Sequence, residues 1–180
     1  MTQASTADQS PGRPLDRKID EAVLNAVREL LLESGYVGLS LTAIAQRAGT
    51  TRPALSRRWA SLDHLVHEAA FPESLAAPRE DADARPVREL VAGSLAAFAD
   101  PVARAAAPGL VAAITADPSL HRRLLERFSL ALGGIEQPLL DLVAGAALFA
   151  LLLHPDDLDA EPTRSAWIDR ITHLLTKGTS

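Results

Sequence analysis

The feature that most constrains this chain is the spacing of its apolar residues, which recur every three or four positions along most of its length. An example near the start is the set Ile19, Val23, Ala26, Val27 and Leu30. These residues fall on one face of a helix, because an α-helix turns once in about 3.6 residues. No segment alternates apolar and polar residues as a half-buried strand does. The sequence therefore predicts an all-α fold of about nine helices.

Capping residues delimit four helices in the first 70 positions. Ser40, Thr51 and Ser61 each precede an apolar run, and each can accept a hydrogen bond from a free backbone N–H at a helix start. Gly35 and Gly49 each follow an apolar run and suit the left-handed conformation that often ends a helix. The predicted helices span residues 15–33, 41–48, 52–58 and 62–70.

Prolines delimit the helices of the second part. Asp100-Pro101 and Asp117-Pro118 each combine a capping carboxylate with a proline suited to the first helical turn. Pro108-Gly109 can kink the helix that contains it, and residues 72–86 form a proline-rich linker. The predicted helices span residues 86–99, 101 onward, 118–132, 138–153 and 163–176, with residues 154–162 as a loop.

The charge is distributed unevenly between the two parts. The whole chain carries a formal charge of −5, but residues 1–71 contain 8 Lys/Arg and 8 Asp/Glu and are neutral. Within this neutral part, residues 41–62 contain Arg47, Arg52, Arg57 and Arg58 and no acid. A local cluster of cations on an otherwise acidic protein indicates a surface that faces a polyanion.

Several classes of function are disfavoured. The chain has no cysteine, no nucleophile elbow and no glycine-rich phosphate loop. Asp63, His64 and His67 lack a further metal ligand and are interpreted as a surface cluster. The most apolar run, residues 139–153, contains Asp141 and is shorter than the ~20 residues of a membrane span. We therefore expect a cytoplasmic non-enzyme with no cofactor, no metal and no membrane contact.

The motif that indicates a function lies between the second and third predicted helices. Ala45 and Gly49 have the spacing of a helix-turn-helix, with a small residue where two helices cross and a glycine in the turn. Ile44 and Leu55 supply apolar contacts around the crossing. In such motifs the N-terminal residues of the second helix enter the major groove of DNA.

A longer stretch, AVLNAVRELLLESGYVGLSLTAIAQRAGTTRPALSRRWASLDHL, resembles the N-terminal domain of TetR-like transcriptional regulators. The residues that carry the resemblance are ESGY at 33–36, Thr42, IAxxAG at 44–49, the aromatic Trp59 and Ser61. The resemblance is strong over 20–66 and extends as a layout of helices over 14–176. It implies a helix-turn-helix domain (14–60) and a helical ligand-binding and dimerisation domain (61–180), connected by the helix at 62–70. Residues 1–13 are rich in Ser, Thr, Gly and Pro and are expected to form a disordered tail.

The resemblance also implies a function. The expected protein is a ligand-responsive regulator, a repressor that binds a palindromic operator as a homodimer. Two positions depart from the family, which usually has a tyrosine in place of Ser56 and a lysine in place of Leu62. Both normally contact DNA phosphates, and Arg57 and Arg58 are the local substitutes. The alternative is a helical dimer that has lost operator binding and acts as a small-molecule or protein-binding module.

Within the helix-turn-helix, Leu55 and Trp59 are four residues apart and are expected to face inward. Arg52 can donate two hydrogen bonds to guanine, a contact that discriminates between bases. The residues predicted to contact DNA are Thr42, Thr51, Arg52, Pro53, Ala54, Ser56, Arg57 and Arg58.

The remaining predictions concern the second domain. Its last two helices carry small and apolar residues that suit a dimer seam, namely Leu139, Leu142, Ala146, Phe149, Trp167, Ile171 and Leu174. A pocket for an unknown small apolar effector is expected among the preceding helices. Its candidate lining residues, each of which can equally be plain core, are Leu95, Phe98, Val111, Ile114, Phe128 and Phe149.

Overall fold

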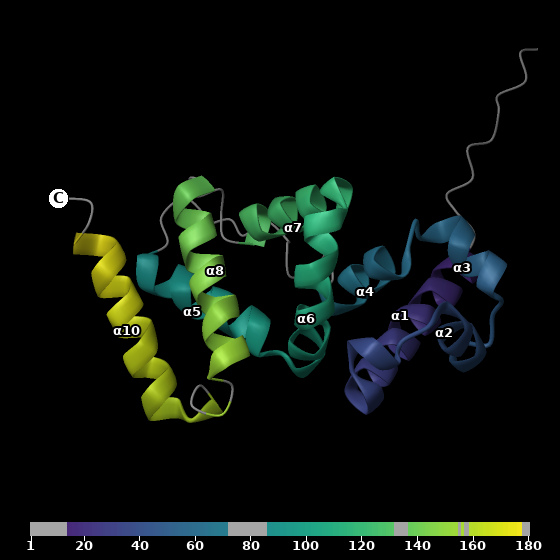
Figure 1. The fold of residues 1–180 in the computed structure, drawn as a ribbon, viewed down its shortest axis with the longest axis horizontal. Coiled ribbons are helices and arrows are strands. Elements are labelled where there is room, and N and C mark those ends of the chain that lie inside the picture. The colour runs from purple at the N-terminus through teal and green to yellow at the C-terminus, as the bar shows by residue number, and fades with distance from the viewer. Residues whose placement is uncertain (1–13, 72–85, 132–136, 155, 157–158, 178–180) are drawn as a thin grey trace, which may run out of the picture.

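A computed structural model describes residues 14–71, 86–131, 137–154, 156 and 159–177 (Figure 1). Within these ranges the chain is helical and has no strand, which confirms the predicted all-α fold. The elements are α1 (Pro14–Ser34), the 3-10 turn η1 (Tyr36–Gly38), α2 (Leu41–Arg47), α3 (Arg52–Arg58), α4 (Leu62–Ala70), α5 (Val87–Ala99), α6 (Pro101–Ala116), α7 (Pro118–Ala131), α8 (Gln137–Leu153) and α10 (Glu161–Lys177). The predicted tail, 1–13, and most of the linker lie outside the described residues.

The helices form an elongated arrangement with two groups at its ends (Figure 1). One end is built from α1, α2 and α3, and the other from α5, α8 and α10. Between them lie α4, α6 and α7, and α6 contacts both α1 and α5. The middle helices are therefore the structural link between the two ends.

The N-terminal core forms from the apolar face that the sequence predicted for α1. Val23 and Val27 are fully buried, and they share the core with Ile44 of α2 and Leu55 of α3. Burial of each such side chain contributes about 1.5–3 kcal/mol. Leu65 of α4 joins the same core at 0% exposure, and α4 packs against α1 as well as against α6.

The predicted caps of the later helices are confirmed. Asp100 Oδ1 accepts hydrogen bonds from the backbone N–H groups of Val102 and Ala103 at 2.9 and 3.0 Å. Asp117 Oδ1 likewise accepts from the N–H groups of Ser119 and Leu120 at 2.8 and 3.3 Å. These bonds satisfy donors that have no partner inside the helix.

Helix α6 continues through Pro108, where the sequence had suggested a kink. Pro108 has no N–H to donate, and Gly109 beside it has no side chain. The ring of Tyr36 occupies the resulting space, and a Cβ atom on Gly109 would lie 2.2 Å from ring carbons of Tyr36. This position of α6 is therefore where η1 packs against it.

The start of the last helix was predicted two residues too late. The expected loop, 154–162, ends sooner because α10 begins at Glu161 and includes Pro162. A proline is tolerated in the first turn of a helix, where its missing N–H would have no partner in any case.

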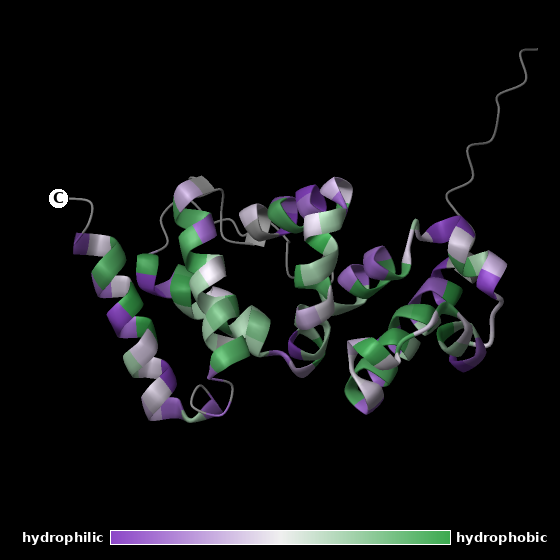
Figure 2. Cartoon of the chain, viewed as in Figure 1, coloured by the Kyte–Doolittle hydropathy of each residue, from purple (hydrophilic) through white to green (hydrophobic). Residues whose placement is uncertain are grey.

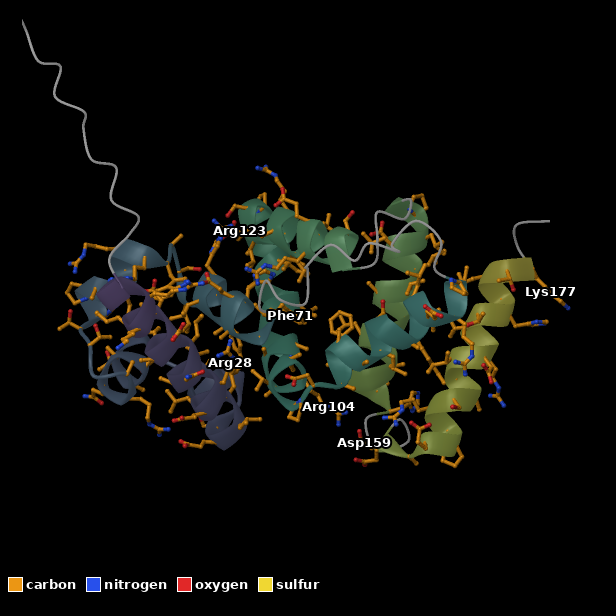
Figure 3. The ribbon with its side chains drawn as sticks, turned by 180° about the vertical axis from the view of Figure 1, so that it is seen from behind. Arg28, Phe71, Arg104, Arg123, Asp159 and Lys177 are labelled. Atoms are coloured by element: carbon orange, nitrogen blue, oxygen red, sulfur yellow. The ribbon has the colours of Figure 1, made fainter. Side chains whose placement is uncertain are left out.

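Ion pairs attach α10 and the residues before it to the rest of its group. Arg104 of α6 binds both carboxylate oxygens of Asp159, at 2.8 and 3.2 Å. Arg88 of α5 donates to Asp169 of α10 at 2.9 Å. Figure 3 shows Arg104 and Asp159 facing each other at one edge of the molecule.

Among the described helices, none is long and apolar enough on its own to cross a membrane. One bent pair, α5 with α6 at 87°, meets the length and composition criteria when the two helices are taken together.

Candidate nucleic-acid interface

The turn between α2 and α3 has the geometry that the sequence predicted. Ser40 Oγ accepts from the N–H of Ala43 at 3.1 Å and thereby caps α2. Gly49 has φ 64°, the left-handed conformation that glycine adopts without strain. Thr51 Oγ1 then accepts from the N–H of Ala54 at 3.4 Å and caps α3. Ala45, 4% exposed, lies at the contact of the two helices and lets them approach closely.

The inner face of α3 is fixed by two large side chains. Leu55 and Trp59 are 1% and 7% exposed, which confirms that both face the core. Trp59 also donates its indole N–H to Glu68 of α4 at 3.0 Å. The orientation of α3 about its own axis is therefore set by apolar packing and by one hydrogen bond to α4.

The outer face of α3 follows from that orientation. Positions that lie opposite Leu55 and Trp59 on the helix must point away from the core. Of the residues predicted to contact DNA, six are exposed and two, Ala54 and Arg58, are half-buried. The exposed residues are Thr42, Thr51, Arg52, Pro53, Ser56 and Arg57.

Two of the four local arginines are bound to acids of α1. Arg47 contacts Glu29 at 3.1 Å and Glu33 at 2.8 Å. The hydrogen bond from Arg47 lowers the pKa of the Glu33 carboxyl below its ordinary value. Arg58 Nε lies 2.7 Å from Asp20 Oδ1. Sequence reasoning missed these contacts, because acids of α1 and bases of α2 and α3 are brought together only when the helices pack.

The two positions that depart from the family pattern, Ser56 and Leu62, differ in their burial. Ser56 is exposed, so its hydroxyl is accessible from solvent. Leu62 is half-buried and packs against the hydrophobic core, where it supports the start of α4. The side chain at position 62 therefore has a packing role in this chain. Next to Ser56, the exposed cation is Arg57.

The predicted surface cluster on α4 is wrong for its two histidines. His64 and His67 are 7% and 2% exposed, because α4 is covered by α1, α6 and α7. His64 exchanges hydrogen bonds with the hydroxyls of Ser61 and Ser119 at 3.0 and 3.1 Å. Asp63 accepts a hydrogen bond from the hydroxyl of Tyr36. The burial of the two histidines could have been predicted from the apolar residues around them in α4.

The predicted pocket residues differ in their exposure to solvent. Leu95 and Phe98 belong to the buried core, and Ile114 is half-buried against it. Val111 and Phe149 are exposed on this single chain, at 37% and 66%. The side chain of Phe128 lies outside the part of the chain that the structure describes. A pocket for an effector therefore stays a prediction.

The predicted dimer residues include several large exposed side chains. Leu142 and Phe149 of α8 are 60% and 66% exposed, and Leu174 of α10 is 67% exposed. Figure 2 shows α8 as an almost entirely apolar helix. The other four, Leu139, Ala146, Trp167 and Ile171, are half-buried.

Comparison with known proteins agrees with this geometry. Residues 23–69, which span most of α1 and all of α2 and α3 and nearly all of α4, match the family described as bacterial regulatory proteins, tetR family. No curated protein matches the chain. The matched segment contains both caps, the turn glycine and the docked α3 described above. The match therefore identifies residues 23–69 as a TetR-like DNA-binding regulatory domain, within the all-α fold of the described residues.

Proposed function

We propose that this regulator is a homodimeric repressor that binds a palindromic operator and releases it when a small effector binds. In this proposal residues 14–60 bind DNA, residues 61–180 bind the effector and the partner, and the protein acts in the cytoplasm without enzymatic activity. The observation that carries the proposal is the outer face of α3. There Arg52 and Arg57 are exposed while Leu55 and Trp59 hold the helix from within.

The different roles proposed for the two arginines of α3 follow from their places on the helix. Arg52 and Pro53 stand in the first turn, the part of a recognition helix that meets base edges. A guanidinium at that place can donate to O6 and N7 of guanine. Arg57 lies in the last turn, where it is suited to a phosphate and supplies affinity without reading sequence.

The dimer is supported by the exposed apolar side chains of α8 and α10. Leu142, Phe149, Leu153 and Leu174 are each more than half exposed. Both helices pack on α5, and exposed large apolar side chains mark a surface for another protein. A second copy is the occupant proposed here, because two-fold symmetry would then present two α3 helices to a palindromic operator.

The response to an effector is supported by the way α4 is held. Arg28 of α1 donates to the carbonyl of Ala69 at 2.9 Å, and Arg127 of α7 donates to the carbonyl of Phe71. The C-terminal end of α4 is therefore bound by one arginine from the N-terminal group of helices and by one from α7. A ligand that binds more tightly when α7 is displaced would favour a shifted position of α4. That shift would reach α3, because Glu68 of α4 accepts the hydrogen bond from the indole of Trp59.

The test is a titration of the protein against labelled intergenic DNA from beside its own gene, at two salt concentrations, with random DNA as competitor. Binding that resists the competitor is the expected result. Binding that random DNA removes equally at both salt concentrations would contradict operator recognition and would leave the binding-module alternative.

The operator affinity of variants at positions 56 and 62 distinguishes the repressor from the binding-module alternative. The variant Ser56→Tyr restores the usual family residue at an exposed position. If Arg57 already supplies the missing phosphate contact, operator affinity changes little. A large gain from near-zero binding would show that the chain had lost its operator contact. Leu62→Lys is the complementary variant, and its stability must be measured as well because Leu62 packs against the core.

A further inference from the structure

His64 lies where α4 meets the corner between α6 and α7. Asp117 is the single residue between these two helices, and Ser119 stands in the first turn of α7. His64 Nε2 is 3.1 Å from Ser119 Oγ, and His64 Nδ1 is 3.0 Å from Oγ of Ser61, the residue that caps α4. One imidazole therefore joins the capped start of α4 to the capped start of α7.

The hydrogen bonds around His64 determine which nitrogen carries the proton when the ring is neutral. The hydroxyl of Ser119 donates to Asp117 Oδ1 at 2.7 Å, so its oxygen accepts from His64 Nε2. His64 Nδ1 then accepts from the hydroxyl of Ser61, whose oxygen also accepts from the backbone N–H of His64 at 3.2 Å. The neutral ring is thus fully hydrogen-bonded, although the residue is only 7% exposed.

A second proton on His64 has a partner in place. Both ring nitrogens are donors in the charged form, and Asp117 Oδ2 lies 3.6 Å from His64 Nδ1. Hydrogen bonds from Ser119 lower the pKa of the Asp117 carboxyl below its ordinary value, so this group stays negative in mild acid. Protonation of His64 therefore adds an ion pair between α4 and the corner of α6 and α7.

The other titratable groups of α4 are His67, Asp63 and Glu68. Burial, then Arg127 and Arg123 of α7, lower the pKa of His67 to about 4, so this ring is neutral where histidines ordinarily titrate. The two acids accept hydrogen bonds from aromatic side chains of other elements. None of these groups supplies a charge that replaces Asp117 beside His64.

Two further helices that pack on α4, α1 and α6, have charged groups engaged elsewhere. Arg28 of α1 donates to the carbonyl of Ala69 at 2.9 Å, at the opposite end of α4 from His64. Arg104 is the one charged residue of α6, and it is paired with Asp159. Three acids of α1 form ion pairs with arginines of α2 and α3, and they are Asp20, Glu29 and Glu33.

Helix α7 holds α4 at both ends. Besides the contact at His64, Arg127 of α7 donates to the carbonyl of Phe71, the residue that ends α4. The start of α4 meets the start of α7, and its end meets a later turn, so the two helices run in the same general direction (Figure 1). A displacement of α7 must therefore break the contact at His64 or carry α4 with it.

We propose that the contact of His64 with Ser119 and Asp117 is a proton-dependent joint that holds α4 in its operator-binding position. Protonation of His64 strengthens the joint, so mild acid favours this position and opposes the displacement of α7 by an effector. The inference rests on the proposed function, in which the ligand-free protein binds the operator. It adds the proton to the effector as a second signal.

The first measurement uses the full chain without DNA and determines whether the joint exists. Urea unfolding is followed at about pH 7.5 and about pH 5.5, which lie on either side of the usual histidine titration. The proteins are wild type, His64→Gln, Asp117→Asn and the double variant. Asparagine caps a helix as aspartate does, so Asp117→Asn removes the charge and keeps the cap of α7. The coupling between the two positions, as a factor in the unfolding equilibrium constant, should rise about three- to fivefold in acid.

The second measurement determines whether the joint controls DNA binding. On acidification the operator affinity of wild type should rise about three- to fivefold more than that of His64→Gln, with random DNA as the reference at each pH. Ser119→Ala removes the acceptor of His64 Nε2 and should lower operator affinity about two- to tenfold. The matched control is His121→Gln, which removes an exposed histidine of α7 and should respond to pH as wild type does.

A coupling between His64 and Asp117 that does not change with pH overturns the joint. An operator response of wild type no larger than that of His64→Gln overturns its control of DNA binding. The two proposals fail separately, because the urea experiment involves no DNA. A protein that binds its operator but lacks the coupling refutes the joint alone, whereas a coupling that rises in acid without operator binding supports the joint and refutes the proposed function.

Discussion

The ring of Tyr36 lies so close to Gly109 that a Cβ atom there would stand 2.2 Å from Tyr36 Cγ. The hydroxyl of the same tyrosine donates to Asp63 of α4. Burial and the contact with Asp63 both raise the pKa of Tyr36, so it stays a donor over the working pH range. One side chain between α1 and α2 therefore contacts two of the three middle helices, α4 and α6.

Gly109→Ala should destabilise the protein by about 1–3 kcal/mol, the usual cost of overpacking a tight contact. Equilibrium denaturation with urea measures the change. The control is Gly93→Ala, where a Cβ atom meets nothing within 4 Å. Because alanine is the better helix former, that variant should be more stable by about 0.5–1 kcal/mol.

The cost at Gly109 should depend on Tyr36. In a Tyr36→Ala background, Gly109→Ala should cost much less, because the clashing ring is absent. An equal cost in both backgrounds would show that the loss at Gly109 arises elsewhere in α6.

A second prediction concerns the ion pair between Asp20 and Arg58. Asp20→Asn should release Arg58 towards DNA and strengthen binding to all sequences. The plot of log affinity against log salt should become steeper by about 0.9, the value for one additional phosphate contact. Fluorescence anisotropy with random duplex DNA at several salt concentrations measures both quantities.

The matched control for this change is Glu21→Gln, which removes the same charge from the adjacent, exposed position of α1. It should raise the affinity slightly and leave the salt slope unchanged. Identical slopes for the two variants would mean that Arg58 stays with α1 when DNA binds.

Arg52 and Arg57 should differ in what they contribute. Arg52→Ala should relax base preference, with a loss of about 1–3 kcal/mol confined to the operator. Arg57→Ala should weaken operator and random DNA alike and flatten the salt slope. Binding measured on the operator and on single-base operator variants distinguishes the two patterns. If Arg52→Ala leaves affinity and base preference intact, α3 does not read DNA in the proposed way.

Local signals in the sequence predicted most of the fold. Ser40, Thr51 and Asp100 cap the helices that they were expected to cap, because an N-cap depends only on residues within one turn. The inward positions of Leu55 and Trp59 were predictable for the same reason, since helical spacing fixes which side chains share a face.

Contacts between distant residues could not be predicted in this way. Nothing in the sequence around Arg58 indicates Asp20, and Tyr36 and Gly109 are brought together only when α6 packs on η1. The histidines of α4 were misjudged because polar residues are usually exposed, whereas α4 is enclosed by three other helices. Burial of this kind follows from the tertiary arrangement.

The buried His67 should make stability depend on pH. Its pKa is about 4 in the folded chain against an ordinary 6.5, so between these pH values the unfolded chain binds a proton that the folded chain does not. The free energy of unfolding should therefore fall as the pH is lowered from 6.5 to 4, by at most about 3 kcal/mol. Denaturation of wild type and His67→Gln across this range isolates the effect. The exposed His121 supplies the control, since His121→Gln should retain the wild-type dependence.

The apolar side chains of α8 and α10 should hold the dimer together. Phe149→Glu places a charge on an exposed apolar surface, so it should leave the single chain folded and shift the protein to a monomer. Sedimentation equilibrium measures the mass, and circular dichroism checks the fold. Leu32→Glu is the matched control, because Leu32 is 58% exposed on α1, at the opposite end of the molecule from α10 (Figure 1). A dimer that survives Phe149→Glu, or one that Leu32→Glu disrupts, would place the contact on another face.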